Sequence, residues 1–121
     1  MHHQNELRTR IKKFALRVIQ LSATLPTTKE GYVIGKQVLR SGTSVGAQFR
    51  EAFRAKSDAD YISKIEGAIG ELDETQYWFE LLVEAEIVTP KRLEELMKQS
   101  DELLAILTTI VRNVKAKNPK R

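Results

Sequence analysis

Apolar residues recur every three or four positions along four successive segments of the chain, and this spacing places them on one face of an α-helix. The pattern predicts helices over residues 6–25, 28–55, 58–87 and 90–117, and no segment shows the alternation typical of a strand. The four apolar stripes comprise Leu7, Ile11, Phe14, Val18, Leu21 and Leu25; Ile34, Val38, Val45, Phe49 and Ala52; Tyr61, Ile65, Ala68, Leu72, Thr75, Phe79 and Leu82; and Leu93, Leu96, Leu103, Leu107, Ile110 and Val114.

Proline and capping residues mark the expected helix boundaries. Pro26 follows the first helix, and Thr27 with Glu30 has the spacing of a capping box at the start of the second. The remaining signals are Ser57 or Asp58 before the third helix, Thr89-Pro90 at the start of the fourth and Asn118-Pro119 after it. Because the connections are short, each helix must return beside its predecessor. We therefore expect an all-α protein, a single antiparallel up-and-down four-helix bundle over residues 1–121.

Three glycines interrupt the second predicted helix, and each reduces helix propensity by about 1 kcal/mol relative to alanine. Gly42 and Gly46 stand four positions apart, and Gly35 lies about two turns before Gly42. Small residues at this spacing let a neighbouring helix approach closely, and this is the interpretation that we favour. The alternative is that they admit a ligand or a backbone segment.

The sequence offers no set of residues for catalysis or metal binding. It contains no cysteine, and its two histidines, His2 and His3, stand beside the first residue. The helical hydroxyls of Ser41 and Ser44 therefore have no histidine base in view. We expect no enzyme activity, no cofactor, no metal and no small-molecule substrate. No apolar run has the length of a membrane span and the first residues lack a signal peptide's apolar stretch, so we expect a cytoplasmic protein with no membrane partner.

Charge is distributed unevenly along the chain, whose formal net charge is +4. Residues 1–56 hold 11 Lys and Arg against 3 Asp and Glu, residues 57–111 hold 4 against 13, and residues 112–121 hold 5 against none. At about 100° per residue, the four basic residues of the second helix fall within an arc of about 80° opposite its apolar face. A second basic edge lies on the first helix, and a basic C-terminal tail covers residues 115–121.

A basic surface of this kind suits a phosphate backbone, so RNA or DNA is an expected partner. The residues expected to contact nucleic acid are Arg10, Lys13, Arg17, Lys36, Arg40, Arg50, Arg54, Lys115 and Lys117. The alternative is that the basic residues form ion pairs within or between subunits. The acidic residues expected as their partners occupy a narrow arc of the third helix: Glu66, Asp73, Glu80 and Glu84.

The third predicted helix is apolar on nearly every side around its tryptophan. Tyr77, Trp78 and Leu81 lie outside the arc that the bundle core would use, which is centred on Leu72. Apolar surface outside the core usually marks an association surface. We therefore expect a homo-oligomer joined through these three residues.

Two blocks of the sequence, residues 37–52 and residues 60–82, resemble a family of bacterial four-helix-bundle proteins that includes reading frames in intervening sequences of large-subunit ribosomal RNA genes. The first block carries an Arg-Ser-x-x-Ser motif from Arg40 to Ser44, and the likeness extends to residues 14–26. Where many relatives look like Ala-Asn-Ile, this chain has Ala47-Gln48-Phe49, and it has Glu51-Ala52 in place of Glu-Gly.

The resemblance implies a four-helix bundle. Relatives of this family include accessory proteins of diversity-generating retroelements, which form pentameric barrels that engage a reverse transcriptase and nucleic acid. The resemblance thus implies a non-enzymatic pentameric accessory protein with nucleic acid or a reverse transcriptase as partner. The alternative function is a purely structural or protein-interaction module that binds no nucleic acid.

Overall fold

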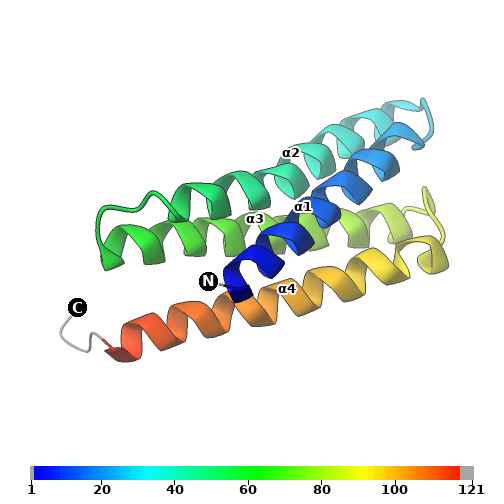
Figure 1. The fold of residues 1–121 in the computed structure, drawn as a ribbon. Helices are drawn as coiled ribbons and strands as arrows, with labels where there is room; N and C mark the ends of the chain where they lie inside the picture. The colour runs from blue at the N-terminus through cyan, green and yellow to red at the C-terminus, as the bar shows by residue number, and fades with distance from the viewer. Residues whose placement is uncertain (1, 118–121) are drawn as a thin grey trace.

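Four long helices pack side by side in the computed structural model, which describes residues 2–117 and the side chains of residues 5–117 (Figure 1). They are α1 (His2–Ala23), α2 (Lys29–Ala52), α3 (Asp58–Glu84) and α4 (Pro90–Lys117). Consecutive helices are antiparallel and joined by short connections, so α2 packs between α1 and α3, and α3 packs between α2 and α4. The predicted all-α, antiparallel four-helix bundle is confirmed.

The helix ends differ from the predicted ones by a few residues. Helix α1 begins at residue 2 rather than 6, whereas α2 and α3 each end three residues before the predicted position. The capping box predicted for Thr27 and Glu30 is wrong: Thr28 caps α2, because its side chain accepts a hydrogen bond from the Gly31 amide at 3.1 Å. Ser57 rather than Asp58 caps α3 by accepting from the Asp60 amide at 3.0 Å.

Most residues of the predicted apolar stripes form the core, but four of them, Ile34, Tyr61, Ile110 and Val114, are only partly buried. Three further hydrophobic residues are buried: Ile62, Val88 and Val111. Phe14 of α1 and Phe79 of α3 meet edge to face at its centre, with their ring centroids 6.4 Å apart. Two hydroxyls are buried between α2 and α3: Thr75 Oγ1 donates to the Glu71 carbonyl at 2.8 Å and lies 2.8 Å from Ser41 Oγ. Buried polar groups need such partners, so this pair favours one register of α2 against α3.

The glycines of α2 allow α1 to approach closely, as the packing interpretation predicted. A Cβ atom added at Gly42 would lie 2.7 Å from Val18 Cγ1, and one added at Gly46 would lie 3.3 Å from Ile11 Cγ2. On α3, a Cβ atom at Gly67 would lie 2.8 Å from Gln48 Oε1 of α2. Glycine at these positions therefore sets the spacing of α2 from its two neighbours.

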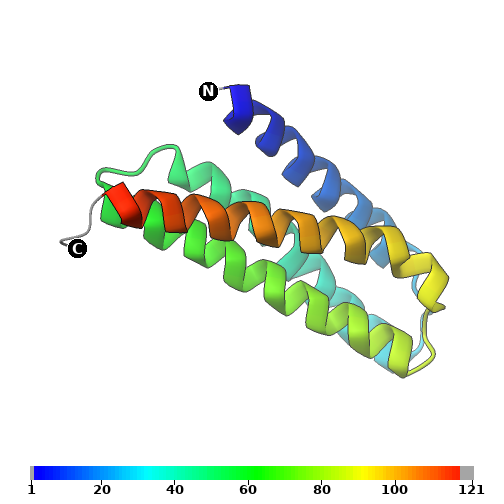
Figure 2. The same ribbon diagram turned by 90° about the horizontal axis from the view of Figure 1, so that it is seen from below.

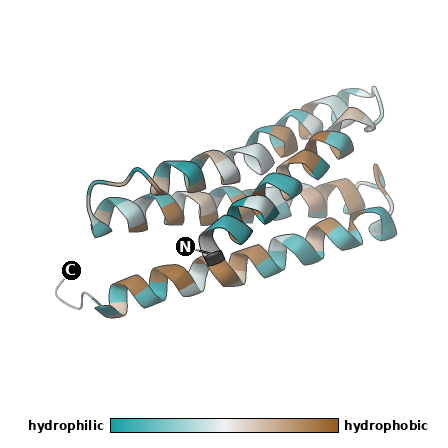
Figure 3. Cartoon of the chain, viewed as in Figure 1, coloured by the Kyte–Doolittle hydropathy of each residue, from teal (hydrophilic) through white to brown (hydrophobic). Residues whose placement is uncertain are grey.

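Helix α1 crosses the bundle at an angle, and its N-terminal half diverges from α4 (Figure 2). It makes far more contact with α2 than with α4. Hydrophilic and hydrophobic residues are interspersed along every helix (Figure 3), which agrees with helices that each bury one face. The tilt of α1 leaves one groove against α2 and another against α4, and the residues that line them have different chemistry.

Candidate nucleic-acid interface

A groove of about 590 Å³ follows the junction between the N-terminal half of α1 and the C-terminal half of α2. Three cations line it: Arg8 and Lys12 from α1 and Arg50 from α2. Its other lining residues include the hydroxyls of Thr9 and Thr43, and no carboxylate is among the described residues that line it. We call this the basic groove. A concave surface with cations and no opposing acid attracts anions such as phosphates.

The two flanks of α1 face different neighbours, which divides its basic residues. Arg8 and Lys12 face α2, whereas Arg10 and Lys13 line a small cleft against α4 that also contains carboxylates. Arg10 Nη2 lies 3.0 Å from Glu102 Oε1 in an exposed ion pair. Arg17 is exposed on the same flank as Lys13. The predicted basic edge therefore faces acidic side chains of α4. The basic groove instead uses Arg8 and Lys12, which were not among the residues predicted to contact nucleic acid.

The predicted basic stripe of α2 is also divided between two neighbours. Arg40 leans toward α3, where it pairs with Glu74 and lies 3.3 Å from Glu71 Oε1. Arg50 leans toward α1 and lines the basic groove. Lys36 and Arg54 are exposed, and neither forms an ion pair with another described residue.

The ion pairs use acidic residues that differ in part from the predicted partners. Glu66 pairs with Lys115 of α4 at 3.2 Å rather than with α2. Arg40 pairs with Glu71 and Glu74, which lie on the flank of α3 that faces α2. The other three acidic residues of the predicted arc, Asp73, Glu80 and Glu84, form no ion pair within the described part of the chain.

The predicted basic tail is largely helical where the structure describes it. Lys115 and Lys117 lie in the last turn of α4, where cations interact favourably with the helix dipole. Residues 118–121 lie outside the described residues, as do the side chains of His2 and His3. The paired Lys115 points toward Glu66 and is remote from the basic groove in sequence and in its contacts.

Exposed aromatic rings stand at both ends of the α1–α2 junction. Phe53, 38% exposed, follows the last turn of α2, and the Arg8 guanidinium lies over its ring at 5.0 Å from the centroid. Tyr32, 63% exposed, lies in the first turns of α2 with Lys36 Nζ 5.3 Å from its ring centroid. A second groove, of about 500 Å³, lies beside Tyr32 and Lys36, and its described lining also contains no carboxylate. The α1–α2 face therefore carries cations and exposed aromatic rings together.

Arg40, Glu74 and Trp78 form a cluster on the opposite flank of α2. The indole Nε1 of Trp78 donates to Glu74 Oε2 at 3.2 Å, and Arg40 donates to the same carboxylate. The Trp78 hydrogen bond and the Arg40 guanidinium together hold the pKa of Glu74 below its ordinary value, and the Glu74 and Glu71 carboxylates raise the pKa of Arg40. These hydrogen bonds favour the charged forms of both groups.

Acidification is expected to change the fluorescence of the chain's one tryptophan with a midpoint below pH ~4.3, the ordinary pKa of glutamate. The folded state lowers the pKa of Glu74, so this interaction is present above that pH and is lost as the pH falls through the lower folded-state pKa. Arg40→Gln should move the midpoint upward. Circular dichroism at each pH separates this local titration from unfolding, and an unchanged midpoint in the variant would contradict the assignment.

The three residues predicted for oligomerisation differ in exposure. Tyr77 is 53% exposed, whereas Trp78 and Leu81 are half-buried and Trp78 packs against the bundle's own core. The ring centroids of Tyr77 and Trp78 lie 5.2 Å apart. Ser41 of α2 meets Thr75 of α3, and counting along both helices from that contact brings Val33, 51% exposed, to within a turn of the level of Leu81. We call Val33, Tyr77, Trp78 and Leu81 the apolar edge.

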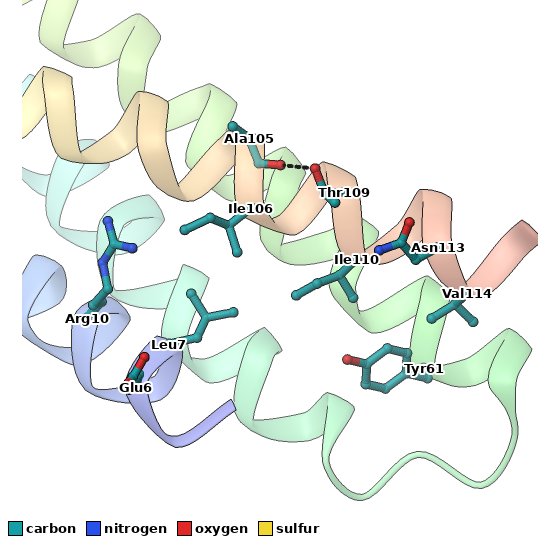
Figure 4. Close-up of a pocket in the computed structure, with 10 residues that line it drawn as sticks. All are labelled: Glu6, Leu7, Arg10, Tyr61, Ala105, Ile106, Thr109, Ile110, Asn113 and Val114. Carbon is teal, nitrogen blue, oxygen red and sulfur yellow. Dashed lines mark hydrogen bonds between the residues drawn. The ribbon is translucent and has the colours of Figure 1, made fainter. Parts of the chain in front are cut away.

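The groove between α1 and α4 has a different character. It measures about 630 Å³, and Leu7, Ile106 and Ile110 point into it (Figure 4). Its one cation among the described lining residues is Arg10, which already pairs with Glu102. This groove therefore suits apolar groups better than phosphates.

The described side chains contain no cluster of three or more His, Asp or Glu residues that could hold a metal ion. Within residues 2–117, none of the helices has an apolar stretch long enough to cross a membrane.

Comparison with known proteins agrees with the fold and extends it. The model of the 23S rRNA-intervening sequence protein family matches residues 3–109. A protein of unknown function from Bacteroides thetaiotaomicron, of the S23 ribosomal protein family, has a crystal structure at 1.70 Å resolution. Its sequence is 38% identical to this chain, and the two structures superpose with a TM-score of 0.85. That match covers 90% of this chain and 97% of the other. No curated protein matches. The chain therefore belongs to the 23S rRNA-intervening sequence protein family.

Proposed function

We propose that this protein is a non-enzymatic, homo-oligomeric accessory protein that contacts the phosphate backbone of RNA or DNA through its basic groove. The observation that carries the proposal is the placement of Arg8, Lys12 and Arg50 around one concave surface that has no carboxylate among its described lining. Sequence-independent affinity for nucleic acid comes from such cations, because each phosphate that they neutralise releases a counterion.

At three of the other basic positions a phosphate would have to displace a carboxylate that already pairs with the cation, whereas in the basic groove it would not. Arg10, Arg40 and Lys115 each face a carboxylate, and that ion pair must break before the cation meets a phosphate. Exposed ion pairs contribute little to stability, about 0–1 kcal/mol, but they do neutralise the local potential. The two free-standing cations of the predicted α2 stripe, Lys36 and Arg54, extend the groove's positive charge along α2.

The family names support this reading of the surface. One name refers to the intervening sequences of 23S ribosomal RNA and the other to a ribosomal protein family. Both names refer to ribosomal RNA or to the ribosome, which supports a nucleic acid as the proposed partner. The outer α1–α2 face would then carry the RNA or DNA contact.

Assembly through the apolar edge is the second part of the proposal. Tyr77 and Val33 are both more than half exposed, and they flank the half-buried Trp78 and Leu81. Aromatic residues surrounded by apolar neighbours are enriched at the centres of protein interfaces. The family resemblance favours a pentamer.

The ion pairs favour a second candidate function, a structural or protein-interaction module. Arg40 bridges α2 and α3 through two carboxylates, Lys64 pairs with Glu51 at 3.2 Å, and Lys115 joins α4 to α3. Under this alternative the basic residues serve packing between helices, and the basic groove binds no nucleic acid.

Removing two cations from the basic groove should distinguish the two functions. Lys12→Ala with Arg50→Ala is expected to weaken binding to unrelated RNAs and DNAs at least about tenfold, since a hydrogen bond to a charged group contributes about 1.5–3 kcal/mol. The slope of log affinity against log salt should flatten by about 1.4 for single strands. Fluorescence anisotropy with labelled oligonucleotides across a salt series measures both.

The matched control is Arg10→Ala with Lys115→Ala, which removes the same charge from two positions that already form ion pairs. This variant should keep most of the affinity and the salt slope. Phosphate contacts are strong at about 50 mM salt. If the wild-type protein binds no nucleic acid under that condition, the structural module is favoured.

A further inference from the structure

The α1–α2 face carries more than cations, and the additional residues point to the form of nucleic acid that fits it. Two of its cations stand in cation–aromatic pairs, Arg8 over Phe53 and Lys36 over Tyr32. The stretch between these pairs exposes apolar side chains. They are Leu16 at 52%, Ile19 at 43% and Leu39 at 37% exposed.

We infer that this face binds single-stranded nucleic acid in preference to duplex, with unpaired bases stacked on the Phe53 and Tyr32 pairs and the phosphates against Lys12 and Arg50. The inference rests on the proposed contact with nucleic acid and specifies its form. A duplex buries the faces of its bases, so aromatic rings on a protein surface cannot stack on them. A single strand presents both a phosphate backbone and open base faces.

At the Phe53 end of the face, neighbouring side chains hold the aromatic ring in a position on which a base can stack. Phe49 is buried and meets the Phe53 ring edge to face, with centroids 5.1 Å apart, which fixes the ring's position. Arg8 lies over the ring, and bases stack on arginine planes as well as on aromatic rings. Lys12 and Arg50 line the adjoining groove, where a phosphate beside the stacked base would lie.

The Tyr32 end repeats the arrangement with different residues. Tyr32 is the most exposed of the large apolar side chains in the described residues, and Lys36 stands beside its ring. Lys29 and Lys36 line the groove next to it, with no carboxylate among the described lining residues. Each end thus offers one aromatic ring with cations beside it.

The two ends are separated by 21 positions along α2, or about 32 Å at 1.5 Å per residue. A stacked strand advances about 3.4 Å per nucleotide, so about ten nucleotides span the face. The exposed Leu16, Ile19 and Leu39 lie between the ends and would contact base faces rather than phosphates. A ligand that presents only phosphates would leave these apolar groups without a partner.

The test compares a labelled strand of about 12 nucleotides, long enough for the span estimated above, with the duplex of the same sequence. The single strand is expected to bind at least about tenfold more tightly at equal salt. Phe53→Leu with Tyr32→Leu should weaken single-strand binding by about 5- to 150-fold for each ring that stacks, and should leave duplex binding and the salt slope unchanged. Circular dichroism checks that the variants fold.

Two controls isolate stacking from packing. Phe53→Tyr with Tyr32→Phe keeps both rings and should retain wild-type affinity, and Thr108→Leu, which introduces a leucine at an exposed position of α4 away from this face, should leave single-strand binding unchanged. Duplex binding as tight as single-strand binding, or equal losses for both in the leucine variant, would overturn the inference while leaving the proposed function in place. Failure of the wild-type protein to bind either form would overturn both.

Discussion

Gly42→Ala is expected to destabilise the protein, although alanine is the better helix former by about 1 kcal/mol. The new Cβ atom would lie 2.7 Å from Val18 Cγ1 and 3.2 Å from Val18 Cβ. Val18 is fully buried and its branched side chain is stiff, so α1 itself must move away from α2. Overpacking of this kind typically costs about 1–3 kcal/mol, which meets or exceeds the gain in helix propensity.

Gly70→Ala provides the matched control for this substitution. Gly70 is exposed on α3, and an added Cβ atom would meet nothing within 4 Å. This variant should therefore gain about 1 kcal/mol from helix propensity alone. Urea unfolding followed by circular dichroism measures both changes. Equal stabilisation in the two variants would show that α1 and α2 have room to spare at Gly42.

Tyr77→Glu is expected to dissociate the assembled protein into smaller species. Wild-type protein at tens of micromolar should sediment as a species several times 13.8 kDa, and about five times that mass if the assembly is a pentamer. A charge at the centre of an apolar interface removes its aromatic contacts and must also be buried, and truncating such a residue alone often costs 2 kcal/mol or more. Because a ring contains several copies of one interface, the loss multiplies.

The control for assembly is Thr108→Glu, which adds the same charge at an exposed position of α4. It should leave the sedimentation of the wild-type protein unchanged, and both variants should keep their helical circular dichroism. Trp78→Glu is less informative, because Trp78 also packs against the subunit's own core. A monomeric wild-type protein would contradict assembly through the apolar edge.

The helices and the core could be predicted from the sequence because both depend on local spacing. Apolar residues three or four apart define a helical face, and the residues of the four predicted stripes are nearly all buried. The role of Gly42 could also be predicted, because a small residue in a long helix needs a close neighbour to offset its cost. The predicted positions of the helix ends were less accurate. The start of α2 depends on which residue caps it, and Thr27 and Thr28 are both suitable capping residues.

The candidate site was predicted only in part. Sequence spacing shows which residues share a face of a helix, but it does not show which neighbouring helix each edge of that face will meet. Arg40 and Arg50 belong to one basic stripe, yet one turns toward the acidic flank of α3 and the other toward α1. Arg8 and Lys12 were missed for the same reason. Their one available signal was that they share a flank of α1 with Leu16 and Ile19, two apolar residues outside the predicted core stripe.

Helix α2 separates the two surfaces proposed for binding. Its flank toward α1 carries Arg50 and the basic groove, and its flank toward α3 carries Val33 and the apolar edge. Copies joined through the apolar edge would therefore each keep a basic groove open to a strand. A nucleic acid long enough to reach a second groove would bind it at a high effective concentration, so avidity would raise the affinity of the assembly far above that of one subunit.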